Sequence, residues 1–136
     1  MLKRKYTMKI YLRPHHLLCI QGYKGYNYNL IQEHYWSYMI KKIKDNPDAD
    51  IFIYKGADDF CKNCPGLNIY NNFICNDIGV SDLDSKVGSF LGIVAGRVYK
   101  YKELLEILSQ KMTNETQKSL CNMCAWWKKG FCHDSF

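Results

Sequence analysis

Along the first 56 residues, the apolar and polar positions follow two patterns, the alternation typical of strands and the spacing typical of helices. Residues 8–13, MKIYLR, alternate as in a short strand. Pro14 then suits the first position of a helix that closes at Gly22, because a helix does not need an N–H group there. A β-branched and aromatic run, ADIFIYKG, ends at Gly56 and predicts a second strand. Residues 8–55 therefore predict a strand, helices and a second strand, and a parallel pairing of the two strands stays open.

The clearest helix lies between these two strands. It is expected from Asn29 to Asp45, and Asn46-Pro47 provides the stop. The apolar residues that recur at helical spacing are Ile31, Tyr35, Trp36, Met39, Ile40 and Ile43.

Three further helices are expected in the second half of the chain. Ser81 with Asp84 three residues later marks a start, and that helix ends before Gly92. A second helix covers residues 101–112, and Asn114 with Gln117 opens a last short helix that runs into Cys121. The positions expected to face the core are Leu83, Val87, Phe90 and Leu91 in the first helix, and Leu104, Leu105 and Leu108 in the second.

Length and composition are those of an ordinary folded domain. The chain has 136 residues, of which 47% are apolar and 24% charged. No linker rich in Pro, Gly or Ser interrupts it. We therefore expect one compact α+β domain over residues 1–136, dominated by helices, with a small two-stranded sheet and cysteine-bearing loops. No apolar run approaches the ~20 residues that span a bilayer, and no apolar signal region follows the basic start, so we expect a cytoplasmic protein without a membrane partner.

Seven cysteines in such a chain point to metal, because cytoplasmic thiols stay reduced and an odd number cannot pair completely. Cys19 stands alone, and the others form two triplets of one pattern, C-x2-C followed by an aromatic or apolar loop and a third Cys. The triplets are Cys61, Cys64 and Cys75 in CKNCPGLNIYNNFIC, and Cys121, Cys124 and Cys132 in CNMCAWWKKGFC. Two thiolates two residues apart can converge on one metal, so each triplet offers three-quarters of a four-ligand site.

The residue after each C-x2-C pair helps to distinguish iron-sulfur clusters from zinc. In zinc knuckles, backbone N–H groups just past the second Cys point at the sulfurs, but here that position holds Pro65, which has no N–H, and Ala125. A Cys followed by Pro occurs in ferredoxin-type cluster motifs, although the spacing of that class is different. The pattern favours an iron-sulfur cluster and keeps zinc as the alternative.

The run RPHHLLC, together with DDFCKNCP and CNMCAWWKKGFC, resembles a prokaryotic family, domain of unknown function 1284. The resemblance covers nearly the whole chain and implies iron-sulfur binding without an established reaction. The positions that carry it are Arg13, Pro14, His15, His16, Leu17, Leu18, Cys19, Asp58, Asp59, Cys61, Cys64, Pro65, Cys75, Cys121, Cys124, Trp126 and Cys132. Ala125 stands where some relatives have Pro.

We expect a [4Fe-4S] cluster held by one triplet and Cys19, in an electron-transfer or cluster-dependent role with a redox or protein partner. The other triplet would hold a second metal with a non-Cys ligand or a cluster with an open iron. His15 and His16, beside Cys19, are further candidate ligands. Asp58 and Asp59 are adjacent and are expected to cap the turn before Cys61.

Two alternatives remain open. One is a structural zinc protein, for example with Cys61, Cys64, Cys121 and Cys124 as ligands, that contacts nucleic acid or a protein through its basic face. The formal net charge of +6 and the KRK start suit such contacts. The other alternative is an enzyme in which Cys19, with His15 or His16, acts as a nucleophile near a structural metal.

Overall fold

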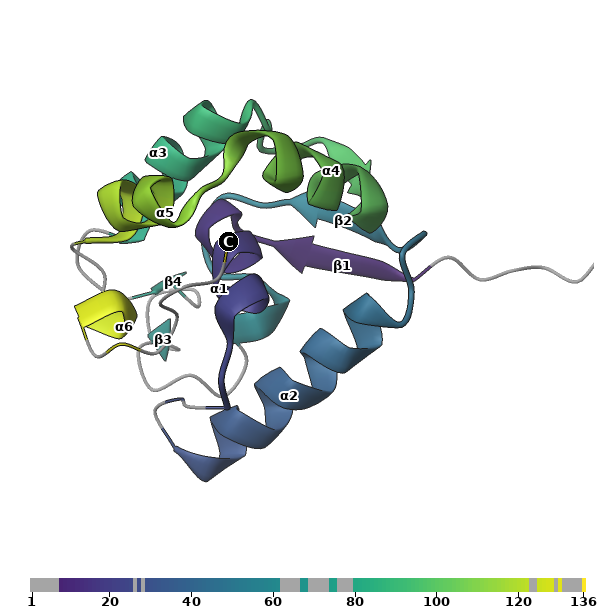
Figure 1. Cartoon of the computed structure of the whole chain (residues 1–136). Helices are drawn as coiled ribbons and strands as arrows, with labels where there is room; N and C mark the ends of the chain where they lie inside the picture. Colours follow the sequence, from purple (N-terminus) through teal and green to yellow (C-terminus); the bar gives the residue numbers. More distant parts are fainter. Residues whose placement is uncertain are drawn as a thin grey trace, which may run out of the picture.

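The computed structural model describes residues 8–25, 27, 29–61, 67–68, 74–75, 80–122, 125–128, 130 and 136, and of 67–68, 74–75, 80–81 and 125–126 it describes the backbone alone. In chain order the elements are β1 (Lys9–Leu12), α1 (Pro14–Gly22), α2 (Leu30–Lys44), β2 (Asp50–Ile53), the 3-10 helix η1 (Asp59–Cys61), β3 (Leu67–Asn68), β4 (Ile74–Cys75), α3 (Val80–Leu91), β5 (Val98–Lys100), α4 (Tyr101–Lys111), α5 (Asn114–Cys121) and α6 (Ala125–Lys128). Helices dominate the described chain (Figure 1).

The main sheet has three strands in the order β1-β2-β5. β1 and β2 pair in parallel, with Leu12 opposite Ile53, so the parallel arrangement left open by the sequence is present. β5 pairs antiparallel with β2, and β3 with β4 forms a separate two-stranded sheet. The expectation of one two-stranded sheet was therefore wrong. β5 escaped notice because it has only 3 residues and runs directly into α4.

The predicted helix boundaries are largely confirmed. Pro14 opens α1, and α2 begins after Asn29, whose side chain accepts a hydrogen bond from the Gln32 N–H. Two helix starts were assigned to the wrong residues. Ser81 lies inside α3, which begins at Val80. Thr113, not Asn114, caps α5, and its hydroxyl accepts a hydrogen bond from the Thr116 N–H 3.1 Å away.

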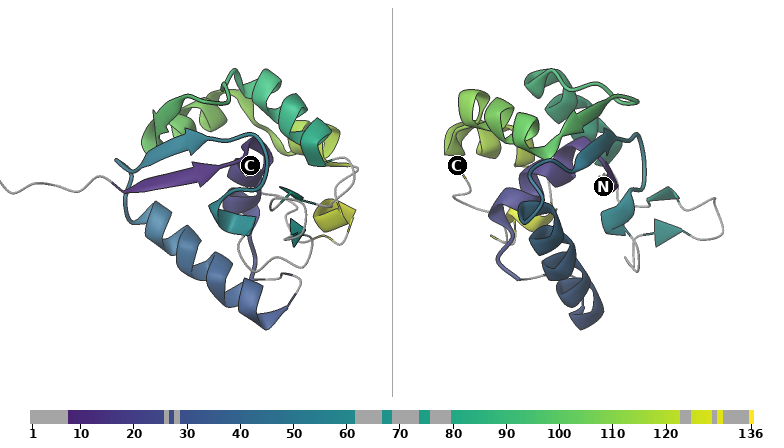
Figure 2. Two further views of the ribbon diagram at one scale, coloured as in Figure 1. Left: turned by 180° about the vertical axis from the view of Figure 1, so that it is seen from behind. Right: turned by 90° about the vertical axis from the view of Figure 1, so that its right-hand side faces the viewer.

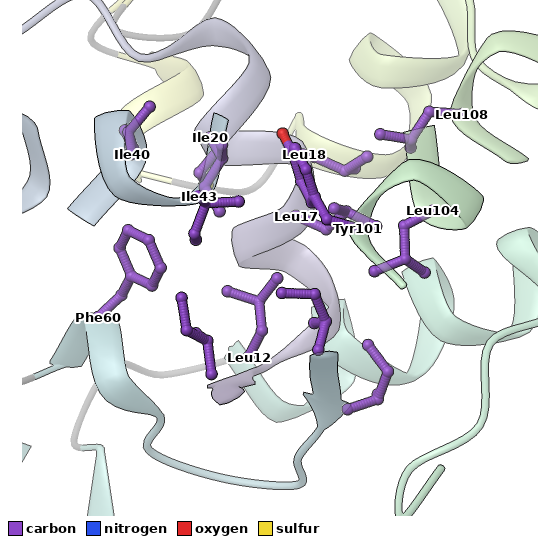
Figure 3. Packing of buried hydrophobic residues seen from close by; sticks show 14 of the residues in the cluster. Leu12, Leu17, Leu18, Ile20, Ile40, Ile43, Phe60, Tyr101, Leu104 and Leu108 are labelled. Carbon is purple, nitrogen blue, oxygen red and sulfur yellow. The ribbon is translucent and has the colours of Figure 1, made fainter. Parts of the chain in front are cut away.

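One face of the main sheet forms the floor of the hydrophobic core. Alternate strand residues belong to this core, namely Ile10, Leu12, Ile51 and Ile53, together with side chains of α1 to α4. Figure 3 shows Leu12 close to labelled side chains of α1, α2 and α4. Three apolar residues expected in helix stripes are instead exposed, namely Ile31, Phe90 and Leu105. Phe90 and Leu105 each neighbour a buried residue in the sequence, so the buried stripe is narrower than the sequence suggested.

The opposite face of the sheet lies outside this core. In the view from behind, β1 and β2 are on the near side, with α2 below them and α3 and α4 above (Figure 2). The carboxyl end of β1 leads straight into α1, and α1 packs against α3. This junction of strand and helices positions the polar site described below. Among the helices that the structure describes, none is both long and apolar enough to cross a bilayer.

Two isoleucines of α2 give a matched test of this core. Ile43 is 0% exposed and Ile31 is 66% exposed. We expect Ile43→Ala to lower the free energy of unfolding by about 2–5 kcal/mol, because it removes buried methyl groups and leaves a cavity. Ile31→Ala should change it by less than about 0.5 kcal/mol. Urea unfolding followed by circular dichroism measures both, and equal losses would contradict the orientation of α2.

Candidate metal centre

The junction of β1 and α1 carries a run of buried polar residues. Arg13 is 1% exposed, and His15 and His16 in the first turn of α1 are also buried. Groups of this kind are rarely buried without partners, because taking them out of water is costly. Their partners are two aspartates from distant parts of the chain, Asp58 and Asp84.

Asp84, on α3, holds the first turn of α1. One of its oxygens, Oδ2, accepts a hydrogen bond from Arg13 Nε at 2.7 Å. The other, Oδ1, lies 2.6 Å from His15 Nδ1 and accepts a hydrogen bond from the His15 backbone N–H at 3.0 Å. The Arg13 side chain does not cap α1. Asp84 therefore satisfies an N–H group at the start of α1 and also compensates the Arg13 charge.

The His15 ring is neutral in this environment. Its burial lowers its pKa to about 4, the charges of His16 and Arg13 act in the same direction, and Asp84 only partly opposes them. Burial by itself would raise the pKa of Asp84, but hydrogen bonds from His15 and the Arg13 charge keep it below its usual range. A carboxylate only accepts hydrogen bonds, so the proton of the neutral ring sits on His15 Nδ1. His15 Nε2 then carries the lone pair.

Asp58 connects β1, α1 and η1. Its Oδ2 accepts a hydrogen bond from the Arg13 N–H at 2.6 Å and lies 2.8 Å from His16 Nδ1. Its Oδ1 accepts hydrogen bonds from the Phe60 N–H at 2.9 Å and from the Cys61 thiol at 3.4 Å. Burial would raise the pKa of Asp58, but its interactions with His16 and the Arg13 N–H hold it below its usual range. The predicted capping role of Asp58 is confirmed.

Asp59 binds the backbone of β1 two residues before Arg13, at Tyr11. Its Oδ2 accepts a hydrogen bond from the Tyr11 N–H at 2.8 Å. β1 is at the edge of the sheet, and the backbone N–H groups of Tyr11 and Arg13 point away from β2 because N–H directions alternate along a strand. The two aspartates therefore occupy N–H groups that an edge strand would otherwise expose.

Cys61 ends η1 and is buried beside this polar cluster. Its Sγ lies 3.4 Å from Asp58 Oδ1 and 4.0 Å from Arg13 Nη1. Burial and then the Asp58 charge raise the pKa of the Cys61 thiol well above its ordinary value. Two side chains of α2 fix η1, since Tyr35 Oη donates to the Asp59 carbonyl at 2.6 Å and Trp36 Nε1 donates to the Phe60 carbonyl at 3.0 Å. Cys61 is therefore protonated unless a cation replaces its proton.

His16, Asp58 and Cys61 together form a possible set of metal ligands. Each offers one ligand atom, and these atoms all lie within 4.8 Å of one another. Nitrogen, oxygen and sulfur donors in one buried site suit transition metals such as zinc and iron. A bound cation would take the place of the thiol proton and offset the Asp58 charge.

The other cysteines divide between the core and the part of the chain that is not described. Cys19 on α1 and Cys121 at the end of α5 are buried in the hydrophobic core cluster. The backbone of Cys75 belongs to β4. Cys64, Cys124 and Cys132, and the side chain of Cys75, lie outside the described residues. Since a nucleophile has to reach its substrate, the burial of Cys19 does not favour a catalytic role for it.

Sequence reasoning missed the roles of Arg13 and Asp84. Asp84 was interpreted as part of a helix cap, whereas its carboxylate is buried between Arg13 and His15. One signal was present. Asp84 stands at helical spacing from Val87 and Leu91, both buried, so a carboxylate occupied a core-facing position of α3. Such a residue needs a buried cation or hydrogen-bond donors as partners.

The fold and the site define a small α+β protein with a buried His-Asp-Cys set suited to a metal ion. Residues 25–130 match the family model described as protein of unknown function (DUF1284). This is most of the chain, so the protein belongs to that family, as its resemblance indicated. The matched range contains Asp58, Cys61 and Asp84 and begins after the RPHHLLC run. No curated protein and no solved structure matches the chain.

The Asp84 ion pair can be tested against an exposed pair of the same kind. Asp84→Asn should lower the free energy of unfolding by about 3–5 kcal/mol, because it leaves the buried Arg13 charge without compensation. The control is Asp45→Asn, which breaks the exposed Asp45–Lys41 pair of 2.9 Å on α2. Urea unfolding should show no measurable loss for the control. Equal effects of the two variants would contradict the role given to Asp84.

Proposed function

We propose that this protein binds a metal centre through its cysteines, and that the centre is an iron-sulfur cluster. The observation that carries the proposal is the buried convergence of His16, Asp58 and Cys61. Cys61 is also the first residue of a C-x2-C pair. The Cys61 thiol donates a hydrogen bond to Asp58, and a metal ion bound there would take the place of the thiol proton beside the carboxylate.

The ligand set that we propose combines the middle triplet with one histidine. Cys61, Cys64 and Cys75 would supply three thiolates, and His16 would supply the fourth ligand that the triplet lacks. This differs from the sequence-based hypothesis, in which Cys19 completes a triplet. The support for His16 is its place in the ligand set with Cys61, whereas Cys19 belongs to the core cluster.

The surrounding residues fit a metal centre of this kind. Asp58 bonds to the His16 ring through Nδ1, which fixes the orientation of the ring, as carboxylates commonly do for metal-binding histidines. The Arg13 guanidinium, close to Cys61 Sγ, would balance the negative charge of a thiolate. Trp36 and Phe60 pack their rings 5.1 Å and 6.0 Å from the His16 ring and exclude water there.

An iron-sulfur cluster at this place would supply one-electron transfer, or a Lewis acid if one iron is open. The chain would contribute charge balance through Arg13, ligand orientation through Asp58 and a dry wall through Trp36. The same three-thiolate and one-imidazole set also suits structural zinc, so zinc remains the rival metal. The Cys-Pro step at Cys64 and the aromatic loops of both triplets favour the cluster.

Metal analysis of protein purified without oxygen tests the proposal. We expect iron and acid-labile sulfide, a brown colour with broad absorption near ~400 nm, and bleaching on reduction. Stoichiometric zinc without sulfide would support the zinc alternative instead. Absence of both metals from oxygen-free material would contradict metal binding altogether. Aerobic samples are unsuitable, since zinc can replace lost iron in thiolate sites.

Variants then identify the ligands. His16→Gln and Cys61→Ser should each reduce the metal content per chain, because each removes one proposed donor. His34→Gln is the matched control, since His34 is exposed on α2. Cys19→Ser separates the two ligand hypotheses, and it should keep its metal if His16 completes the site. Loss of metal from Cys19→Ser but not from His16→Gln would restore Cys19 as the fourth ligand.

A further inference from the structure

The face of the main sheet that points away from the core carries a cluster of aromatic side chains. Tyr11 on β1 and Phe52 on β2 are opposite each other in the register, and Tyr54 follows β2. Tyr11 is 37% exposed and Tyr54 is 42% exposed, and Phe52 is half-buried. Figure 2 shows this side of the strands in its left view. We call these three residues and Lys9 the aromatic face.

The three rings form one continuous surface. The ring centroids are 5.0 Å apart for Tyr11 and Phe52, 5.8 Å for Tyr11 and Tyr54, and 6.4 Å for Phe52 and Tyr54. The ring planes are tilted against one another by 48° to 80°, so the rings do not stack face to face. The exposure of Tyr11 and Tyr54 leaves part of this aromatic surface open to ligands from solvent.

A cation accompanies the rings. Lys9 Nζ lies 5.3 Å from the Tyr11 centroid and 5.5 Å from the Phe52 centroid. The other lysine in the same row of the sheet, Lys100, is paired with Asp50 at 2.7 Å, whereas Lys9 forms no ion pair with any residue that the structure describes. The Lys9 charge is therefore available to an anionic ligand, in a chain with a formal net charge of +6.

The edge of the sheet beside this face is closed to a further strand. Asp58 and Asp59 already accept hydrogen bonds from the outward N–H groups of Arg13 and Tyr11. A second copy or an extended peptide could not use these groups to add a strand at β1. The arrangement favours a ligand that lies on the face over one that extends the sheet.

We propose that the aromatic face binds single-stranded nucleic acid. Bases have flat π surfaces that stack on exposed aromatic rings, and stacking of this kind tolerates any sequence. Lys9 places a positive charge where the phosphate next to a stacked base would lie. The inference goes beyond the metal centre and does not depend on which metal the protein holds.

Fluorescence anisotropy with a labelled oligothymidylate of about 12 nucleotides tests the proposal at low salt. The double variant Phe52→Ala with Tyr54→Ala should weaken binding by at least about tenfold, because it removes two stacking surfaces. Lys9→Glu should also weaken binding and lower its salt dependence. Duplex DNA of the same length should compete poorly, since its bases are not available for stacking.

The chain offers matched controls on α2. Tyr38 is 61% exposed, and Lys42 Nζ lies 5.9 Å from its ring centroid, so this pair has the same kinds of group as the aromatic face at another place on the surface. Tyr38→Ala and Lys42→Glu should leave the affinity within about twofold of the wild type. Circular dichroism checks that each variant is folded. If the double variant does not fold, the affinity of Lys9→Glu tests the proposal instead.

Three results would overturn the proposal. The first is no binding of the oligonucleotide by the wild-type chain. The second is a loss of affinity in the Lys42→Glu control as large as that in Lys9→Glu, because net charge alone would then explain the binding. The third is a dimer of the wild-type chain, seen by analytical ultracentrifugation, that the Phe52→Ala and Tyr54→Ala double variant abolishes, because a second copy would then be the occupant of this face.

Discussion

The first turn of α1 depends on two carboxylates that reach it from other parts of the chain. Arg13 brings a full positive charge into the interior, and Asp84 makes that burial tolerable by accepting hydrogen bonds from the Arg13 side chain and the His15 backbone. Asp58 accepts a hydrogen bond from the Arg13 backbone N–H and contacts the His16 ring. Strand, helix and site are therefore fixed by the same polar contacts. The sheet packs apolar residues beneath them, but the carboxylates decide how the chain passes from β1 into α1.

This polar layer also explains why the candidate site has a defined geometry. Asp58 uses both oxygens and touches the backbone of β1, the ring of His16 and the start of η1. Tyr35 and Trp36 of α2 hold η1 through hydrogen bonds to the carbonyls of Asp59 and Phe60. Cys61 is thus placed by contacts that do not involve its own sulfur, and Asp58 orients the ring of His16.

Local rules were sufficient for most of the fold and insufficient for the site. Pro14 and Asn29 mark helix starts through their own backbone chemistry, so α1 and α2 could be predicted from neighbouring residues. β5 is too short for a periodicity to register. The Arg13–Asp84 pair spans 71 positions, and no local pattern connects residues that far apart. The cysteine spacing predicted metal chemistry but not which sulfurs meet, because that depends on the path of the loops between them.

The closure of the β1 edge by Asp58 and Asp59 links the backbone of the sheet to the state of the site. The amide proton of Arg13 rests on the same carboxylate that touches His16 and Cys61, whereas the amide proton of Tyr11 rests on the adjacent Asp59. A change in the charge around Asp58 would alter the magnetic environment of the Arg13 amide, because that amide donates to the Asp58 carboxylate. The backbone amide resonance of Arg13, between β1 and α1, would therefore report on what the buried Cys61 thiol is bound to.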